Sequence, residues 1–290
     1  MKKVLWGLSK FSIYLISYLP FPILYLVSDF FYYIIYYIVK YRRHVVEPNL
    51  RNSFPEKTEA ELKVIEKKFY RFLCDNILES FKMLTISRNS MKKRLKFLNP
   101  EEAERHFHNG RSVLATGGHY ANWEWGNLAI NLFINKTVLV VYKPLGDKLF
   151  GALLNKMRSR FGTIMVPMKH TLRKIAENRH RLYFAVFVSD QTPTRHESNY
   201  FTEFLNQRTS VFLGIEKIAK TTGNPVVFCY IDRIKRGYYE ARFKTIVEDP
   251  KETSEFEITE IHTKELEQQI KARPELWLWS HKRWKFKSAE

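Results

Sequence analysis

The chain has 290 residues and a formal net charge of +18, from 48 Lys and Arg residues against 30 Asp and Glu residues. A hydrophobic content of 45% and an aromatic content of 15% exclude a disordered basic tail. The charge favours an anionic partner: nucleic acid, an anionic membrane surface or a phosphorylated substrate. The two cysteines, Cys74 and Cys229, have no nearby Cys or His companion, so we expect neither a disulfide framework nor a zinc site.

The first forty residues are apolar and rich in aromatic side chains. Between Lys10 and Lys40 there is no Lys or Arg, and Asp29 is the one acid. The segment is too long for a signal peptide and lacks a small-residue cleavage site. A membrane span needs about 20 apolar residues, so one spanning helix fits, but Pro20 and Pro22 should break or kink it. One kinked spanning helix and a helical hairpin within one leaflet both fit, and a core helix of a soluble protein is the alternative.

The residues around this segment favour a membrane location. Four tyrosines between residues 32 and 37 suit the membrane–water interface. The basic cluster of Lys40, Arg42 and Arg43 is denser than the lysines before the segment, which puts the rest of the chain on the cytoplasmic side. We therefore expect a membrane-embedded segment over residues 1–43 and a cytoplasmic domain over residues 44–290.

The next part of the chain changes from polar to amphipathic. Residues 44–57 are a polar connector, and Thr58 with Glu59 and Glu61 after it has the pattern of a helix N-terminus. From about 59 to 86, apolar residues recur mostly at steps of three and four, which predicts an amphipathic helix.

Short apolar runs rich in β-branched and aromatic residues follow from residue 112 onward, and such runs are typical of strands buried on both faces. They alternate with helix-like stretches, which indicates βαβ crossovers. We expect an α/β fold with a mostly parallel sheet flanked by helices. The predicted strands are 112–116, 137–142, 163–167, 183–188 and 225–231, and the helices between them are about 123–134, 147–160, 171–179 and 210–221. An alternating stretch at 238–246 predicts a half-exposed edge strand, and a last helix is expected over about 257–272.

The segment from Ala115 to Gly126 (ATGGHYANWEWG) carries the candidate chemistry, because catalytic groups collect where strands end in an open α/β sheet. Asn122 is the expected N-cap of the following helix. On one continuous helix, His119 and Glu124 would lie on different faces, so they converge only if the chain turns between them. We expect Glu124 to accept a hydrogen bond from one imidazole nitrogen, which would leave the other as a base.

The sequence contains no GxSxG nucleophile elbow, no phosphate-binding P-loop and no HExxH metal motif. A His–carboxylate pair without a protein nucleophile fits activation of a substrate hydroxyl for attack on an activated acyl group. The alternative from the residues alone is a structural loop histidine bonded to a carboxylate.

The spacing His119-x4-Glu124 after a strand resembles the His-x4-Asp/Glu motif of glycerolipid acyltransferases. Its Glu form is similar to the branch that adds secondary acyl chains in lipid A biosynthesis, the lauroyl and myristoyl transferases. Five further segments resemble that branch in the same order: Asn49–Pro55, Lys156–Arg160, Ser189–Gln191, Thr221–Val226 and Pro274–Trp284. The sequence departs from the family pattern at Phe204-Leu205-Asn206, where many relatives have Phe-Phe-Gly, and at Lys282, which replaces an arginine.

The resemblance implies a role for each candidate residue. His119 would be the base and Glu124 would orient it, while Arg158 would steady the oxyanion or hold an acceptor phosphate. Asp190, Arg160 and Asn122 would contribute to substrate binding. The acyl donor would be acyl carrier protein and the acceptor an anionic lipid A precursor, at the cytoplasmic side of a bacterial inner membrane, with no cofactor and no metal.

Other functions remain open from the sequence. A lysophospholipid, aminolipid or glycolipid acceptor would use the same His–Glu chemistry. A non-catalytic, basic membrane-surface protein is the alternative outside the enzymes. A nucleic-acid partner is not expected, because no nucleic-acid-binding module is recognisable and the apolar N-terminal segment serves no such purpose.

Overall fold

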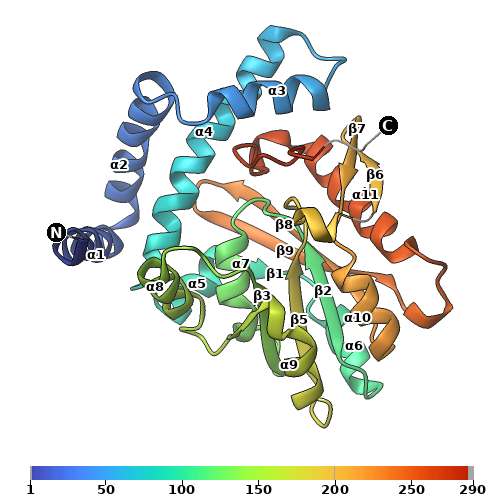
Figure 1. Ribbon diagram of the computed structural model, residues 1–290. Helices are drawn as coiled ribbons and strands as arrows, with labels where there is room; N and C mark the ends of the chain where they lie inside the picture. The colour runs from blue at the N-terminus through green and yellow to red at the C-terminus, as the bar shows by residue number, and fades with distance from the viewer. Residues whose placement is uncertain (1, 199, 287–290) are drawn as a thin grey trace.

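In a computed structural model, which describes residues 2–198 and 200–286, helices cover both faces of a central sheet and an N-terminal helical arm lies at one side (Figure 1). The sheet has seven strands in the order β1-β9-β8-β2-β5-β3-β4. The strands are β1 (Leu95–Phe97), β2 (Val113–Gly117), β3 (Thr137–Tyr142), β4 (Ile164–Pro167), β5 (Tyr183–Val188), β8 (Val226–Lys235) and β9 (Tyr238–Val247). The predicted α/β class and the mostly parallel sheet are confirmed.

The pairing of the strands explains why the sheet is mostly, rather than wholly, parallel. The five strands β8, β2, β5, β3 and β4 are parallel to one another. Strand β9, on the other side of β8, is antiparallel to it. The prediction of an edge strand at 238–246 was wrong. The short strand β1 pairs with β9 and is the edge strand instead. Strand β1 was not predicted from the sequence, because it has only three residues and lies within a basic stretch.

Both faces of the central strands are buried. In β2, Val113 and Ala115 join one apolar cluster and Leu114 joins the other. Strand β5 divides in the same way, with Phe184 and Val186 on one face and Ala185 on the other. This two-sided burial is why these strands appear in the sequence as continuous apolar runs.

The helices form a layer on each side of the sheet. On the first face lie α4 (Glu59–Lys82), α5 (Arg88–Arg94), α6 (Glu101–His108), α7 (Trp123–Ala129) and α8 (Lys148–Arg158). On the second face lie α9 (Thr171–Glu177), α10 (Gly214–Thr222) and α11 (Glu257–Ala272). Helix α4 begins at a capping box formed by Thr58 and Glu61. The N-terminus predicted at Thr58 is therefore confirmed.

The apolar N-terminal segment is helical but not continuous. Helix α1 (Lys2–Tyr18) ends before Pro20, and α2 (Phe21–Tyr33) runs in a different direction from α1 (Figure 1). Helix α2 continues directly into a π-helical turn, η1 (Ile34–Ile38). Among the described residues, the stretch Phe21–Ile38 is long and apolar enough to cross a membrane, and 22% of it is buried.

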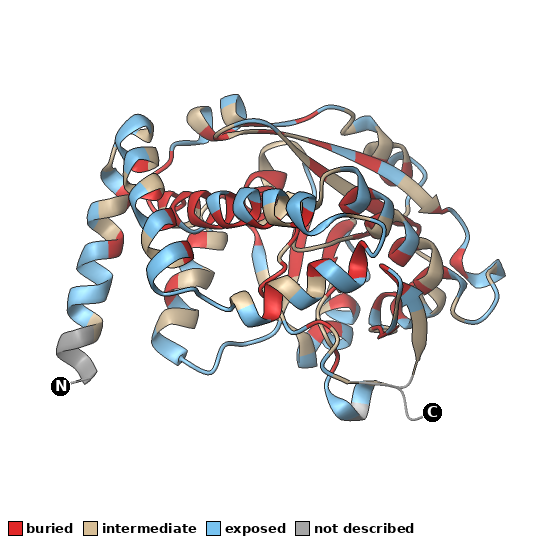
Figure 2. Ribbon diagram, turned by 90° about the horizontal axis from the view of Figure 1, so that it is seen from above, coloured by how far each residue is buried: buried red, intermediate tan, exposed pale blue. Residues whose placement is uncertain are grey.

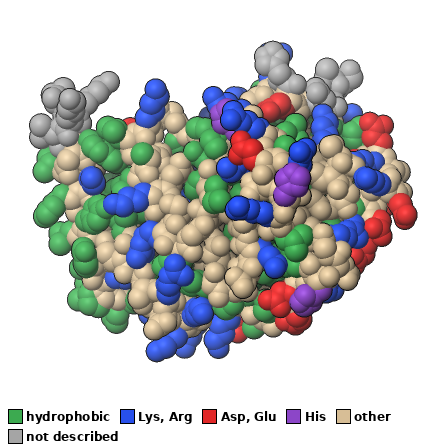
Figure 3. All heavy atoms as spheres, turned by 90° about the horizontal axis from the view of Figure 1, so that it is seen from below, with side chains coloured by type: hydrophobic (Ala, Val, Ile, Leu, Met, Phe, Trp, Pro, Cys, Tyr) green, Lys and Arg blue, Asp and Glu red, His purple; other side chains and the backbone are tan. Residues whose placement is uncertain are grey.

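The outer side of this helical arm is apolar and open to solvent. Figure 2 shows mostly exposed and intermediate residues along the N-terminal helix, and Figure 3 shows apolar side chains gathered on this side of the molecule. The exposed large apolar residues of the arm are Leu8, Phe11, Leu15, Tyr18, Ile23, Leu26, Phe30, Phe31, Tyr33, Tyr37, Ile38 and Val39. A contiguous apolar surface of this extent is typical of a membrane or protein contact.

Besides β1, a helix and a hairpin were missed by the sequence analysis. The predicted polar connector is largely a helix, α3 (Arg43–Ser53), which includes Pro48 and buries Val46 and Leu50. A hairpin of β6 (Phe201–Phe204) and β7 (Gln207–Ser210) lies apart from the main sheet. Its turn residues Leu205 and Asn206 have φ values of 51° and 59°, a conformation that favours glycine, which accounts for the glycine in the family pattern there.

The closing segment after α11 packs into the domain. The side chains of Trp277 and Trp279 are buried, and their rings meet edge to face at 4.7 Å. Tyr120 forms an isolated β-bridge with Trp277. The end of the chain therefore lies against the loop that follows β2.

Candidate active site

The loop between β2 and α7 is tightly constrained. A Cβ atom on Gly118 would come within 2.6 Å of the end of the Leu266 side chain and 3.2 Å of a carboxylate oxygen of Asp190, so a larger residue there would displace Leu266 and crowd Asp190. Ala121 has a φ of 47°, which an L-residue rarely adopts, and its N–H donates to the carbonyl of Leu276. Asn122 caps α7 by accepting a bond of 2.9 Å from the N–H of Trp125, as the sequence predicted. The loop is thus fixed at both ends.

His119 lies beside Asp190 because of the strand register. Gly117 at the end of β2 pairs with Val188 at the end of β5, and each of the two site residues follows two positions later. The His119 Nδ1 atom lies 2.6 Å from Asp190 Oδ1, and the His119 N–H donates to Asp190 Oδ2 over 2.9 Å. Trp277 Nε1 donates to the same Oδ2 over 2.7 Å.

The ionisation of Asp190 determines the tautomer of His119. Burial raises the pKa of the Asp190 carboxyl, but the charge and hydrogen bonds of His119 and the bond from Trp277 outweigh burial and lower it to about 2. The carboxylate can only accept, so His119 Nδ1 is the donor. In the neutral imidazole, His119 Nε2 is then the acceptor, and it lies 3.3 Å from the side-chain amide nitrogen of Gln191.

The carboxylate partner expected for His119 was wrong. Glu124 is instead bound by Arg158, whose Nε donates to Glu124 Oε2 over 2.7 Å and whose Nη2 donates to Oε1. The Arg158 and Glu124 side chains are only 16% and 8% exposed. Burial lowers the pKa of the Arg158 guanidinium, but Glu124 outweighs burial and raises it. The described residues show no hydrogen bond between Glu124 and His119.

The other two candidates have polar partners within the protein. Arg160 Nη1 donates to the backbone carbonyls of Met83 and Ile86, just after α4. Asn122 Nδ2 donates to Glu79 Oε2 over 2.6 Å. Both side chains therefore fix elements around the site, and the Asn122 side chain is fully buried.

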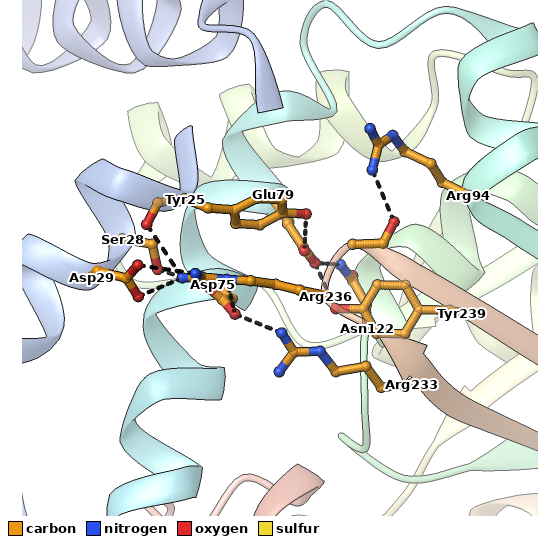
Figure 4. Close-up of polar contacts among 11 residues, drawn as sticks. Tyr25, Ser28, Asp29, Asp75, Glu79, Arg94, Asn122, Arg233, Arg236 and Tyr239 are labelled. Carbon is orange, nitrogen blue, oxygen red and sulfur yellow. Dashed lines mark hydrogen bonds and ion pairs between the residues drawn. The ribbon is translucent and has the colours of Figure 1, made fainter. Parts of the chain in front are cut away.

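A buried polar network around Glu79 supports the loop between β2 and α7 (Figure 4). The Glu79 carboxylate accepts hydrogen bonds from Tyr25, Asn122 and Tyr239. Burial, followed by the negative charge of Asp75, raises the pKa of Glu79 to about 7, although the tyrosine bonds oppose this rise. Glu79 thus links the N-terminal arm to the cap of α7.

Sequence reasoning missed three side chains around the His119–Asp190 pair. Gln191 faces His119 Nε2, and Trp277 donates to Asp190. Arg283 is 3% exposed and lines a small cavity with Asp190 and His262, and burial lowers its pKa to about 10. Gln191 and Arg283 lie in the segments 189–191 and 274–284 that resemble the family, which was the available signal.

A groove leads from the N-terminal arm to Gln191, the neighbour of His119. We call it the apolar groove: it is lined by Ile35 and Val39 of the arm, Leu73 and Ile77 of α4, and Leu278, and it reaches Gln191 and His281. Its volume is about 420 Å³, within the range of small-molecule pockets, roughly 300–1,000 Å³. Among residues 2–198 and 200–286, no group of three or more His, Cys, Asp or Glu residues is arranged to hold a metal ion.

Comparison with known families identifies the chain. The family model for bacterial lipid A biosynthesis acyltransferase matches residues 4–286. The chain belongs to this family. It is therefore an acyltransferase, and the lipid A acyltransferase match covers the arm, the His119 loop and the closing segment together. A comparison with curated proteins gave no match.

Proposed function

We propose that this lipid A acyltransferase moves a fatty acyl chain from the thioester of acyl carrier protein to a hydroxyl of a lipid A precursor. The observation that carries the proposal is the geometry of His119. Asp190 holds its Nδ1, and Nε2 faces Gln191 at the end of the apolar groove. An imidazole held in one tautomer by a buried carboxylate is the arrangement that general-base catalysis needs.

The proposed reaction needs no protein nucleophile. The acceptor hydroxyl gives its proton to His119 Nε2 while its oxygen attacks the thioester carbonyl carbon. The carbon–sulfur bond then breaks, an ester forms, and the leaving carrier thiolate takes the proton from His119. Asp190 stabilises the imidazolium that exists between these two proton transfers.

Glu124 and Arg158 have a supporting role in this proposal. Glu124 binds Nε and Nη2 of Arg158, and Nη1 has no hydrogen-bond partner among the described residues. We assign this Nη1 to the oxyanion or to an acceptor oxygen, because a fixed guanidinium stabilises developing negative charge. Asn122 and Arg160 act through the elements that they hold, by fixing α7 and the end of α4.

The proposed site of action is the cytoplasmic face of a bacterial inner membrane. The exposed apolar side of the arm supports insertion of residues 1–43 into the bilayer, with residues 44–290 as the cytoplasmic domain. The net charge of +18 supports attraction to anionic lipid and to an acidic carrier protein. The apolar groove opens between the arm and α4, where an acyl chain can enter from the membrane.

The test is a transfer assay with the full chain purified in detergent. Labelled acyl carrier protein thioesters are offered with a Kdo-modified lipid A precursor, lysophosphatidic acid or the lyso form of an aminolipid. Wild type is measured beside His119→Ala, and membrane fractionation of both shows that the variant is produced and located normally.

We expect transfer to the lipid A precursor by wild type and its loss in His119→Ala. Transfer to another acceptor alone would support the proposed acyl-transfer mechanism and refute the lipid A precursor as the acceptor. Undiminished transfer by His119→Ala would refute the assignment of the base.

A further inference from the structure

A second pocket lies on the other side of α4 from the apolar groove. We call it the cationic pocket: it is lined by Lys68, Arg71, Arg233, Arg236 and Arg273, together with the carboxylates of Asp29, Asp75 and Glu275. Its volume is about 310 Å³, enough for a small polar group. Its walls come from α2, α4, the β8–β9 turn and the residues after α11.

The base of this pocket is rigid. Asp75 accepts bonds from Ser28, Arg233 and Arg236, and Arg236 also binds Asp29. Figure 4 shows these side chains converging from three separate elements. Because the carboxylates hold them, the two guanidinium groups are already fixed before any ligand arrives, which lowers the entropy lost on binding.

The rim of the pocket carries the surplus charge. Five cations face three carboxylates, so the pocket has an excess of two positive charges. Lys68 and Arg71 form no ion pair within the described residues, and both side chains are exposed at the rim. Arg71 also lies 5.0 Å from the ring centre of Tyr32 in the arm, which holds it at the junction of α2 and α4.

The pocket lies beside the exposed apolar side of the arm. Helix α4 lines the cationic pocket with Lys68 and Arg71, and its opposite face lines the apolar groove with Leu73 and Ile77. Leu276 lines the first and Leu278 the second. Asp29 of α2 lines the pocket, and its neighbours on the same helix face, Leu26 and Tyr33, are exposed apolar side chains. A charged site beside an exposed apolar helix matches a lipid, whose anionic headgroup and acyl chains are joined.

We infer that the cationic pocket binds a phosphate group, carried on the headgroup of a lipid whose acyl chains lie against the exposed apolar side of the arm. Guanidinium and ammonium groups arranged around a cavity are the usual recognition of phosphate oxygens. The inference deepens the proposed function, since it assigns a place to the phosphate of the acceptor. It can also be tested by a binding measurement that needs no acyl transfer.

The experiment uses the full chain in an uncharged detergent. The probes are phosphatidic acid and diacylglycerol in dodecyl maltoside micelles, and inorganic phosphate alone. The pocket variant is Lys68→Gln/Arg71→Gln, and the control is Lys67→Gln/Lys264→Gln, which removes the same charge from exposed positions outside the pocket. Thermal unfolding of all three proteins shows that they are folded.

We expect wild type and the control to bind phosphatidic acid more tightly than diacylglycerol, and the pocket variant to lose roughly tenfold in affinity for phosphatidic acid. Equal losses in pocket and control variants would overturn the inference, because they would show a general charge effect. Binding of inorganic phosphate as tight as that of phosphatidic acid would reassign the pocket to free phosphate.

The transfer assay separates this inference from the proposed function. With a phosphorylated acceptor, the pocket variant should raise KM with little change in kcat, and its KM for the dephosphorylated acceptor should match wild type. Specific phosphatidic acid binding without any acyl transfer by wild type would refute the proposed function but support phosphate binding in the cationic pocket.

Discussion

Two buried carboxylates follow β2 and β5 at the same edge of the sheet, and each binds a basic side chain in a different way. Asp190 accepts three hydrogen bonds, two from His119 and one from Trp277, and leaves one imidazole nitrogen facing Gln191. Glu124 is occupied by two nitrogens of Arg158. The imidazole is 19% exposed, so a substrate can reach it.

The difference between the two pairs decides what each can do. An imidazole gains and loses a proton near neutral pH, whereas a guanidinium stays protonated throughout the physiological range. The His119–Asp190 pair can therefore move a proton, and the Glu124–Arg158 pair can hold structure and attract negative charge. This division of labour can be tested one pair at a time.

The largest expected effect is on catalysis by His119→Ala. Loss of a general base should lower the transfer rate by roughly 10²–10⁴-fold. The initial rate is measured at equal concentrations of folded protein, with circular dichroism to confirm the fold. If Glu124→Gln slowed transfer more than His119→Ala, the assignment of the base to the first pair would be contradicted.

Arg158→Met should lower both stability and transfer, and the double variant with Glu124→Leu separates the two effects. The single substitution leaves the Glu124 carboxylate buried without its partner, which typically costs about 3–5 kcal/mol. Chemical unfolding in detergent measures this loss, and Glu124→Leu/Arg158→Met should recover most of it. Transfer by the double variant should stay below wild type, because Arg158 Nη1 is absent. Full activity in a restabilised double variant would show that the pair is purely structural.

Glu79 should make the stability of the folded protein depend on pH. Its pKa is raised from 4.5 to about 7 in the folded protein, so the folded state holds a proton that the unfolded state has released. Stability should therefore fall as pH rises from about 4.5 to about 7, by up to roughly 3 kcal/mol. Unfolding of wild type and Glu79→Gln across this range checks it. Parallel curves for the two proteins would exclude Glu79 as the source.

The smallest expected effect is that of Asn122→Ala. The change removes an N-cap bond to Trp125, which typically costs about 1 kcal/mol, together with the bond to Glu79. Thermal unfolding should show a modest shift, and transfer should fall less than tenfold because Asn122 acts through the position of α7. A loss of transfer as large as that of His119→Ala would instead indicate direct contact with the substrate.

The sequence predicted the strands of the sheet and most of its helices, because two-sided burial leaves continuous apolar runs. It predicted His119 as a loop residue and Asn122 as a cap for a similar reason: both follow from local backbone chemistry. Strand β1 and the helix α3 were missed because each is short or polar and depends on tertiary packing.

The partner of His119 could not be derived from spacing. Glu124 is five residues away, whereas Asp190 is 71 residues away and three strands, β3, β4 and β5, intervene in the chain. The strand order places β5 directly beside β2, and only that order brings His119 and Asp190 together. Arg158 reaches Glu124 in the same non-local way, through the packing of α8 against α7.

The central claim is that Asp190 acts through His119, and a double-mutant cycle on transfer rate tests it most directly. The rates of wild type, His119→Ala, Asp190→Asn and the double variant are measured with the same donor and acceptor. If the two residues form one unit, the double variant should be no slower than His119→Ala alone. Losses that multiply in the double variant would show that Asp190 works independently of His119.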